Sequence, residues 1–195
     1  MLDKIKDINL ALNNNSYLSA LALSLTLPDI CGQIEYPDLK STRGKRLVGK
    51  QYARWFDDWV SHYYADNGGW TEEGKAINPY FTGNMCYYLR CSFLHGGNSD
   101  IENWGDQEDV DFNYSYQFEL AIGGADKTGS SWGHQPNNKS KILKINSVRV
   151  NIDKLCECIC RSAEKYYRRK EPSVFKDHNI NLVDFKKYKS LYQND

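Results

Sequence analysis

The chain has no excess of charge of either sign and no long hydrophobic run. Its 195 residues include 25 Lys and Arg and 25 Asp and Glu, which gives a formal net charge of zero. This balance excludes a protein that coats nucleic acid along its whole length, and it equally excludes a polyanionic tail. No stretch of about 18 apolar residues occurs, so we expect no membrane span.

The features of a secreted protein are also missing. The opening residues, MLDKIKDINL, are interrupted by acidic side chains and lack the apolar segment of a signal peptide. Six cysteines are few for a disulfide scaffold of this length. We therefore expect reduced thiols in a cytoplasmic protein, whose 41% hydrophobic content is enough for a proper core.

Motifs for metal or cofactor chemistry are absent too. There is no phosphate-binding glycine loop, no Gly-x-Ser-x-Gly turn and no His-Glu-x-x-His motif. Cys156 and Cys160 can share one face of a helix, but they fall in its apolar stripe, so we interpret them as core residues. His62, His134 and His178 have no partner at ligand spacing and are expected at the surface. We predict no metal and no cofactor.

Apolar residues recur at helical spacing in five segments, and the first two of these are separated by Asn13-Asn14-Asn15. The segments are 2–12, 17–25, 46–64, a helix that opens at Thr82 and stops at Gly96-Gly97, and a final helix from Ile152 to Tyr167. Residues 29–45 are expected to form a connection, and about 65–81 an irregular segment.

Strict alternation of apolar and polar residues from Phe112 to Ile122 predicts a strand. A second run, Leu143 to Val150, is expected to pair with it as an antiparallel hairpin. The intervening residues 123–140 form an unusually long loop in this interpretation, which suggests mobility or function.

The predicted architecture is mainly α, and α+β overall. One domain spans residues 1–195: a bundle of about four helices, a β-hairpin inserted at 111–150, and a C-terminal extension at 171–195. The extension includes a basic, helical-looking piece at 186–189.

One constellation stands out on the helix that opens at Thr82. The run Arg90-Cys91-Ser92-Phe93-Leu94-His95 resembles the signature of the HEPN superfamily, an arginine, usually an adjacent polar residue, and a histidine four to six positions later. The preceding run, residues 82–88, is similar to that of uncharacterised bacterial members. The resemblance covers roughly residues 1–97 and 151–170.

This resemblance implies a four-helix domain that dimerises so that two motifs face each other. Many members are metal-independent endoribonucleases, and the bacterial ones suggest a toxin or antiphage-defence setting, with a possible cognate antitoxin. Arg90 and His95 would then be the catalytic residues of a homodimer that cleaves RNA.

Physical chemistry is consistent with those roles. RNA supplies its own nucleophile, the 2′-hydroxyl, so the enzyme needs a base, an acid and positive charge for the phosphate. His95 can serve as base or acid near neutral pH, and Arg90 can hold phosphate oxygens in a bidentate fork. Five helical residues place the two side chains about 140° apart, which suits a cleft lined by two helices better than one intrahelical pair.

One position departs from the family pattern. Catalytic members usually carry Asn, Asp or His after the arginine, whereas this chain has Cys91, whose thiol is a weak hydrogen-bonding group. Ser92 could compensate. The alternative is a non-catalytic module that dimerises or docks a partner or RNA, with Arg90 paired to a carboxylate and His95 favoured by the helix dipole.

Two further groups are candidates for RNA contacts. Trp132 lies in the long loop, where its ring could stack on a base or simply anchor the loop. Arg168, Arg169 and Lys170 end the final helix, where they could follow a phosphate backbone or complement the helix dipole.

Overall fold

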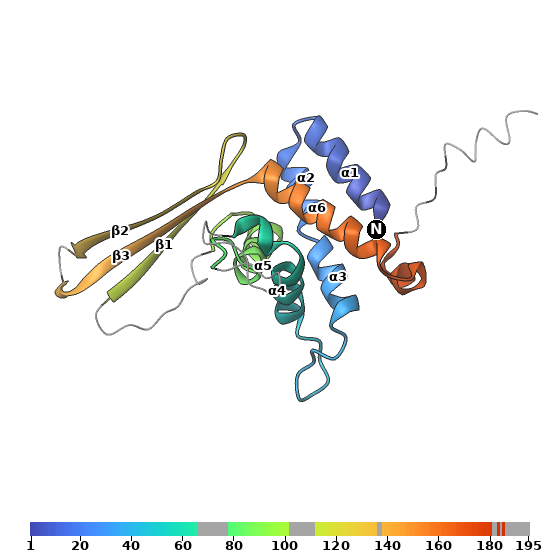
Figure 1. Ribbon diagram of the computed structural model, residues 1–195, viewed down its shortest axis with the longest axis horizontal. Helices are drawn as coiled ribbons and strands as arrows, with labels where there is room; N and C mark the ends of the chain where they lie inside the picture. The colour runs from blue at the N-terminus through green and yellow to red at the C-terminus, as the bar shows by residue number, and fades with distance from the viewer. Residues whose placement is uncertain (66–77, 102–111, 136–137, 181–182, 184, 186–195) are drawn as a thin grey trace, which may run out of the picture.

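The computed structural model describes residues 1–65, 78–101, 112–135, 138–180, 183 and 185; of 112–113, 134–135 and 138–141 it describes the backbone only. A helical body carries a narrow three-stranded sheet that projects from one side (Figure 1). The helices are α1 (Leu2–Asn13), α2 (Tyr17–Ser24), α3 (Leu27–Glu35), α4 (Val48–Trp59), α5 (Gly83–Cys91) and α6 (Ile152–Arg168). The strands are β1 (Phe112–Ala121), β2 (Lys127–Gln135) and β3 (Asn138–Asn151). The α+β class is confirmed.

The N-terminal third contains one helix more than the sequence predicts. The break at Asn13-Asn14-Asn15 is confirmed, and Asn15 adopts a positive φ of 56° there. The expected connection over 29–45 is wrong at its start, because α3 runs through it. Pro28 lies in the first turn of α3, where the missing N–H removes no helical hydrogen bond. Pro28 therefore belongs to the beginning of a helix.

The core lies where α4 packs against α6. On α4, the side chains of Tyr52, Trp55 and Phe56 are fully buried, in agreement with the helical spacing of apolar residues over 46–64. The Trp55 ring lies 6.2 Å from that of Trp59 and 5.9 Å from the buried ring of Tyr166 on α6. The wide aromatic stripe of α4 thus forms the centre of the molecule.

Helix α5 packs directly on the backbone of α4. A Cβ atom on Gly83 would lie 2.1 Å from the carbonyl oxygen of Ala53, so only glycine permits this approach. The hydroxyl of Thr82 accepts a hydrogen bond from the Met85 N–H at 3.4 Å, which confirms the predicted cap. After Cys91 the helix widens into a π-helical turn that ends at Gly97, whose φ is 67°, so the predicted stop is also confirmed.

The sheet differs from the expected antiparallel hairpin. Its strand order is β1-β3-β2, with β1 parallel to β3 and β2 antiparallel to β3. The predicted antiparallel pairing of 112–122 with 143–150 is wrong, because residues 127–135 of the expected loop form a third strand. That strand is rich in Gly and Ser and shows no alternation of apolar and polar residues. It is defined by its hydrogen bonds to β3 and cannot be recognised from its sequence.

The connection from β1 to β2 crosses the end of β3 and is held there by polar side chains. The N–H of Asn151 donates to Asp126 Oδ1 at 2.7 Å, and its amide donates to the Gly124 carbonyl at 3.1 Å. Asp126 Oδ2 accepts from Lys154 Nζ and from the Tyr80 hydroxyl, both at 2.7 Å. These contacts tie the crossing connection, the sheet and α6 together.

We predict that Asp126→Ala destabilises the protein by about 1.5–3 kcal/mol, because it removes a buried acceptor that serves charged and backbone donors. Urea unfolding monitored by circular dichroism measures the change. The matched control is Glu157→Ala, which removes an exposed carboxylate from α6. Equal stability of the Asp126→Ala variant and the natural protein would contradict this role.

Candidate functional site

Arg90, the first residue of the motif, points into the protein and forms an ion pair. In the last turn of α5, its Nη2 lies 3.1 Å from Asp29 Oδ2 of α3, and its side chain is only 18% exposed. The same carboxylate bonds Arg46, which also donates to the Asp29 carbonyl at 2.9 Å. Asp29 therefore holds two arginines, and through them it links α3 to α5 and to the segment before α4.

His95, the other end of the motif, is exposed in the π-helical turn Ser92–Gly96. Between the two, the Ser92 hydroxyl donates to the Asp100 carbonyl, and the half-buried Cys91 thiol lies 4.0 Å from Arg90 Nη1. Arg90 thus has a carboxylate partner within the fold, whereas His95 faces solvent. Their catalytic roles stay a prediction.

We predict that Asp29→Ala lowers the free energy of unfolding by about 1.5–3 kcal/mol, since it leaves Arg46 and Arg90 without their shared acceptor. Arg90→Met should also destabilise, whereas Asp7→Ala, an exposed change on α1, serves as the control. Chemical denaturation of the variants checks this. If Asp29→Ala is as stable as the control, the ion pairs do not hold α3 and α5 together.

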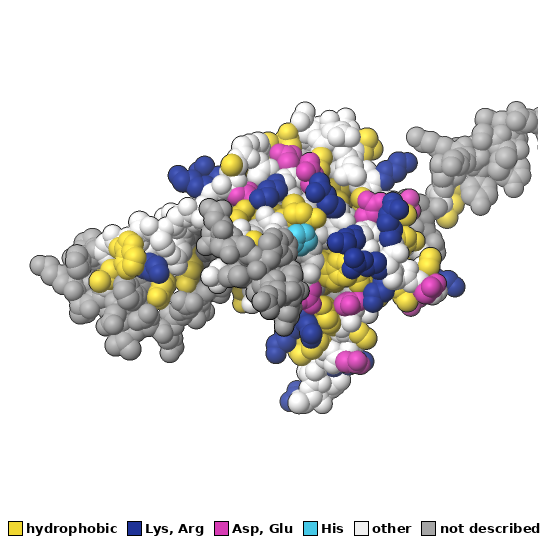
Figure 2. Space-filling view, viewed as in Figure 1, with side chains coloured by type: hydrophobic (Ala, Val, Ile, Leu, Met, Phe, Trp, Pro, Cys, Tyr) yellow, Lys and Arg dark blue, Asp and Glu magenta, His cyan; other side chains and the backbone are white. Residues whose placement is uncertain are grey.

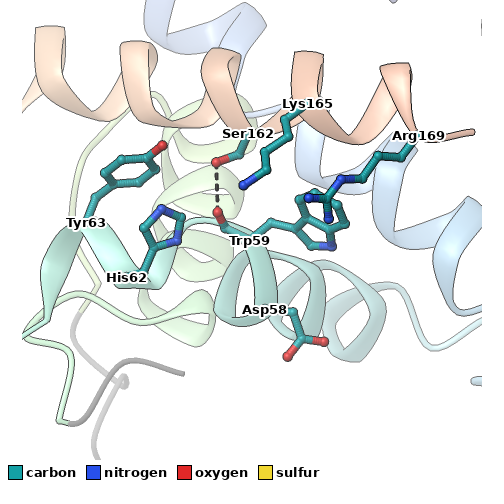
Figure 3. Close-up of a pocket in the computed structure, with 7 residues that line it drawn as sticks. All are labelled: Asp58, Trp59, His62, Tyr63, Ser162, Lys165 and Arg169. Carbon is teal, nitrogen blue, oxygen red and sulfur yellow. Dashed lines mark hydrogen bonds between the residues drawn. The ribbon is translucent and has the colours of Figure 1, made fainter. Parts of the chain in front are cut away.

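A pocket of 260 Å³ lies between α4 and α6 (Figure 3). Lys165 and Arg169 extend from α6 over Trp59, while His62 and Tyr63 come from the 3₁₀ turn Ser61–Tyr64 that follows α4. The hydroxyl of Ser162 donates to the Trp59 carbonyl at 2.8 Å and joins the two helices beneath it. The full lining consists of Asp58, Trp59, His62, Tyr63, Ser162, Lys165 and Arg169.

The charge of this pocket is mainly positive. The Arg169 guanidinium lies 5.3 Å from the Trp59 ring centroid, in cation–π contact. Burial, and then the neighbouring charge of Lys165, lower the pKa of His62, so this imidazole is neutral at pH 7. The one acidic lining residue, Asp58, accepts a hydrogen bond from the Tyr36 hydroxyl on its other side. The pocket can therefore hold an anion between two cations and an indole.

The positive surface continues along α6 beyond the pocket. The Arg161 guanidinium lies 5.8 Å from the ring of Tyr63, and Arg161, Lys165 and Arg169 follow one another every four residues. We call the pocket together with Arg161 the α6 groove. Lys and Arg side chains gather on the face of the helical body shown in Figure 2.

The predicted basic cluster at the end of α6 divides into three roles. Arg169 lines the groove. Arg168 is paired with Glu164 at 2.6 Å, and Lys170 with Glu35 of α3 at 2.7 Å. Trp132 lies on β2 and is 66% exposed.

Sequence reasoning missed Trp59, His62 and Lys165 as members of a site. Trp59 belongs to the aromatic stripe, and only its half-buried edge position in the structure distinguishes it from the core residues. His62 and Lys165 lie about a hundred residues apart in sequence, and the packing of α4 on α6 brings them together. The only available signal was the i, i+4, i+8 spacing of cations on the last helix.

Five of the six cysteines are buried in the core, and Cys91 is half-buried. All six thiols are free, and Cys156 and Cys160 are buried as predicted. Burial raises the pKa of Cys156 to about 11 and that of Cys160 to about 12, so both stay protonated at neutral pH. Among the described residues, no group of three His, Cys, Asp or Glu side chains could hold a metal ion. In that same part of the chain, no helix has the length and apolar character needed to cross a membrane.

Comparison of the chain with protein-family models, with curated proteins and with solved structures finds no match. The likeness to the HEPN signature therefore depends on the motif at 90–95 and its helical surroundings.

Proposed function

We propose that the protein is a HEPN-like module that binds RNA through the α6 groove. The observation that carries this proposal is the row of Arg161, Lys165 and Arg169 along one face of α6, beside the rings of Trp59 and Tyr63. Residues four apart on a helix are separated by about 6 Å along its axis, so the row presents cations at regular intervals to an extended polyanion.

The chemistry of the groove suits RNA in two ways. Arginine guanidinium groups grip phosphate oxygens in a fork, and lysine adds a compact positive charge. Aromatic rings next to these cations allow an unpaired base to stack without sequence preference. Because the whole chain is neutral, this local row is what attracts the ligand.

We predict that Lys165→Met with Arg169→Met weakens binding of a single-stranded RNA oligonucleotide by about tenfold for each cation removed. Fluorescence anisotropy over a salt series measures it. The slope of log affinity against log salt should become shallower by about 1.4, since each phosphate contact to a single strand contributes about 0.7.

The matched control removes two exposed lysines elsewhere, Lys6→Met with Lys50→Met, and so has the same net charge. It should bind RNA as the natural protein does. An equal loss of affinity in the control would show that net charge alone, and no particular site, determines RNA binding. Failure of the natural protein to bind RNA would also contradict the proposal.

A second candidate function is metal-independent RNA cleavage at Arg90 and His95 of a homodimer, in a toxin or antiphage-defence setting with a cognate antitoxin. The observation in its favour is the exposure of His95 at the end of α5, where a second copy of the chain can approach it. In an isologous dimer, one His95 can act as the base for the 2′-hydroxyl and the other as the acid for the leaving oxygen.

Under this second candidate, His95→Ala should lower the cleavage rate about 10²–10⁴-fold without loss of stability, and EDTA should have no effect. His178→Ala is the control, and Cys91→Asn, which introduces a residue type found in catalytic HEPN members, should raise the rate. Gel analysis of a labelled RNA measures all three. Unchanged cleavage by folded His95→Ala protein would end this candidate, while RNA binding through the groove would be unaffected.

A further inference from the structure

A row of three side chains crosses the projecting sheet. Tyr114 of β1 and Trp132 of β2 both lie opposite Lys144 of the central strand. The Lys144 Nζ is 5.6 Å from the centroid of the Tyr114 ring and 5.3 Å from that of Trp132, so the ammonium group lies between two aromatic faces. We call these three residues the sheet platform.

The platform lies on one face of the sheet. At the end of the sheet nearer the helices, side chains of the same face belong to the core. Nearer the helices, Phe118 stacks on Phe81 with ring centroids 5.9 Å apart, and Val148 and Val150 are buried. Side chains alternate along strands, so Tyr114, Tyr116 and Phe118 share this face. The three strands that carry the platform project beyond the helical body (Figure 1).

The charge on this face favours an anionic ligand. Among the strand side chains that the structure describes here, Lys144 supplies a positive charge and no carboxylate occurs. The acidic residue Glu119 lies on the opposite face, where it pairs with Arg149 at 2.7 Å. The platform is therefore complementary to a polyanion that also presents flat rings.

Two polar side chains lie on the same face beside the platform. Beside the platform, the Ser130 hydroxyl donates to the side-chain carbonyl of Asn146, so these two groups bond each other across β2 and β3. The exposed Trp132 ring and the Lys144 ammonium group on this surface suit an unpaired nucleobase with its phosphate. A base inside a duplex is already stacked on both sides and has no face to offer.

We propose that the sheet platform binds an unpaired base of single-stranded RNA by stacking it on Trp132, while Lys144 holds a backbone phosphate. The inference rests on the proposed function in that the ligand is RNA, but it uses a surface separate from the α6 groove. Stacking on Trp132 is tolerant of sequence, so the platform adds affinity for single strands rather than for a particular base.

The test uses a single-stranded RNA oligonucleotide that contains 2-aminopurine, whose fluorescence is quenched on stacking against an indole. The natural protein should quench it, whereas the fluorescence of a duplex that contains the same base, already low because that base is stacked, should not change when protein is added. Trp132→Ala should abolish the protein-dependent quenching, Lys144→Met should weaken affinity about tenfold, and Trp132→Phe should retain most of the affinity. Circular dichroism establishes that each variant is folded.

The matched control is Lys127→Met, which removes one exposed lysine from the opposite face of the same sheet and should leave quenching and affinity unchanged. Natural affinity and quenching in folded Trp132→Ala protein, or equal quenching with the duplex, would overturn the platform. The proposals for the groove and for the platform can be refuted independently of each other. If only the groove is wrong, Lys165→Met with Arg169→Met binds normally while Trp132→Ala still loses quenching; if only the platform is wrong, the reverse holds.

Discussion

The side chain and backbone of Asn151 fix the sheet on the helical body, and the placement of both candidate RNA surfaces depends on this junction. Asn151 is the last residue of β3, and its side-chain oxygen accepts the Lys154 N–H at 3.2 Å as the N-cap of α6. No linker intervenes between strand and helix, so the sheet cannot swing freely against α6. Asp126 completes the junction by binding the Asn151 N–H and Lys154 together. The platform on β3 and the groove on α6 consequently belong to one continuous segment of chain.

Helix α6 serves the core and the surface at the same time. Its apolar stripe buries Leu155, Ile159 and Tyr166, whose ring meets Trp59 edge to face at 5.2 Å. Because Trp55 stacks on Trp59 with ring centroids 6.2 Å apart and Tyr166 meets it edge to face, the indole is held by the core, while Arg169 lies 5.3 Å from its centroid in the groove. A base stacked in the groove would meet a ring that packing has already positioned, which lowers the entropy cost of binding.

The elements that the sequence predicts correctly are those whose apolar period is long and regular. Helices α4, α5 and α6 and strand β1 follow from periods of 3.6 and 2, and the two ends of α5 with its π-helical turn follow from Thr82 and Gly97. Strand β2 could not be predicted, because Gly and Ser residues carry no period and its pairing partner defines it. Because β2 was not predicted, β1 was expected to pair with β3 as an antiparallel hairpin, whereas the two strands are parallel. In the groove, Arg169 was predicted because cations cluster near it, whereas His62 came into contact with Lys165 only through tertiary packing.

Catalytic use of Arg90 would require competition with Asp29. A phosphate that takes the guanidinium must replace a carboxylate oxygen at 3.1 Å in a site that is largely shielded from water, where charge pairs are strong. Arg46 reduces that cost, because it bonds the same carboxylate and would keep Asp29 paired after Arg90 leaves. The buried Nε of Arg90, which has no hydrogen-bond partner among the described residues, shows that its guanidinium is only partly satisfied in the ion pair. The balance between these contacts, and not the presence of the motif alone, determines whether Arg90 can reach a substrate.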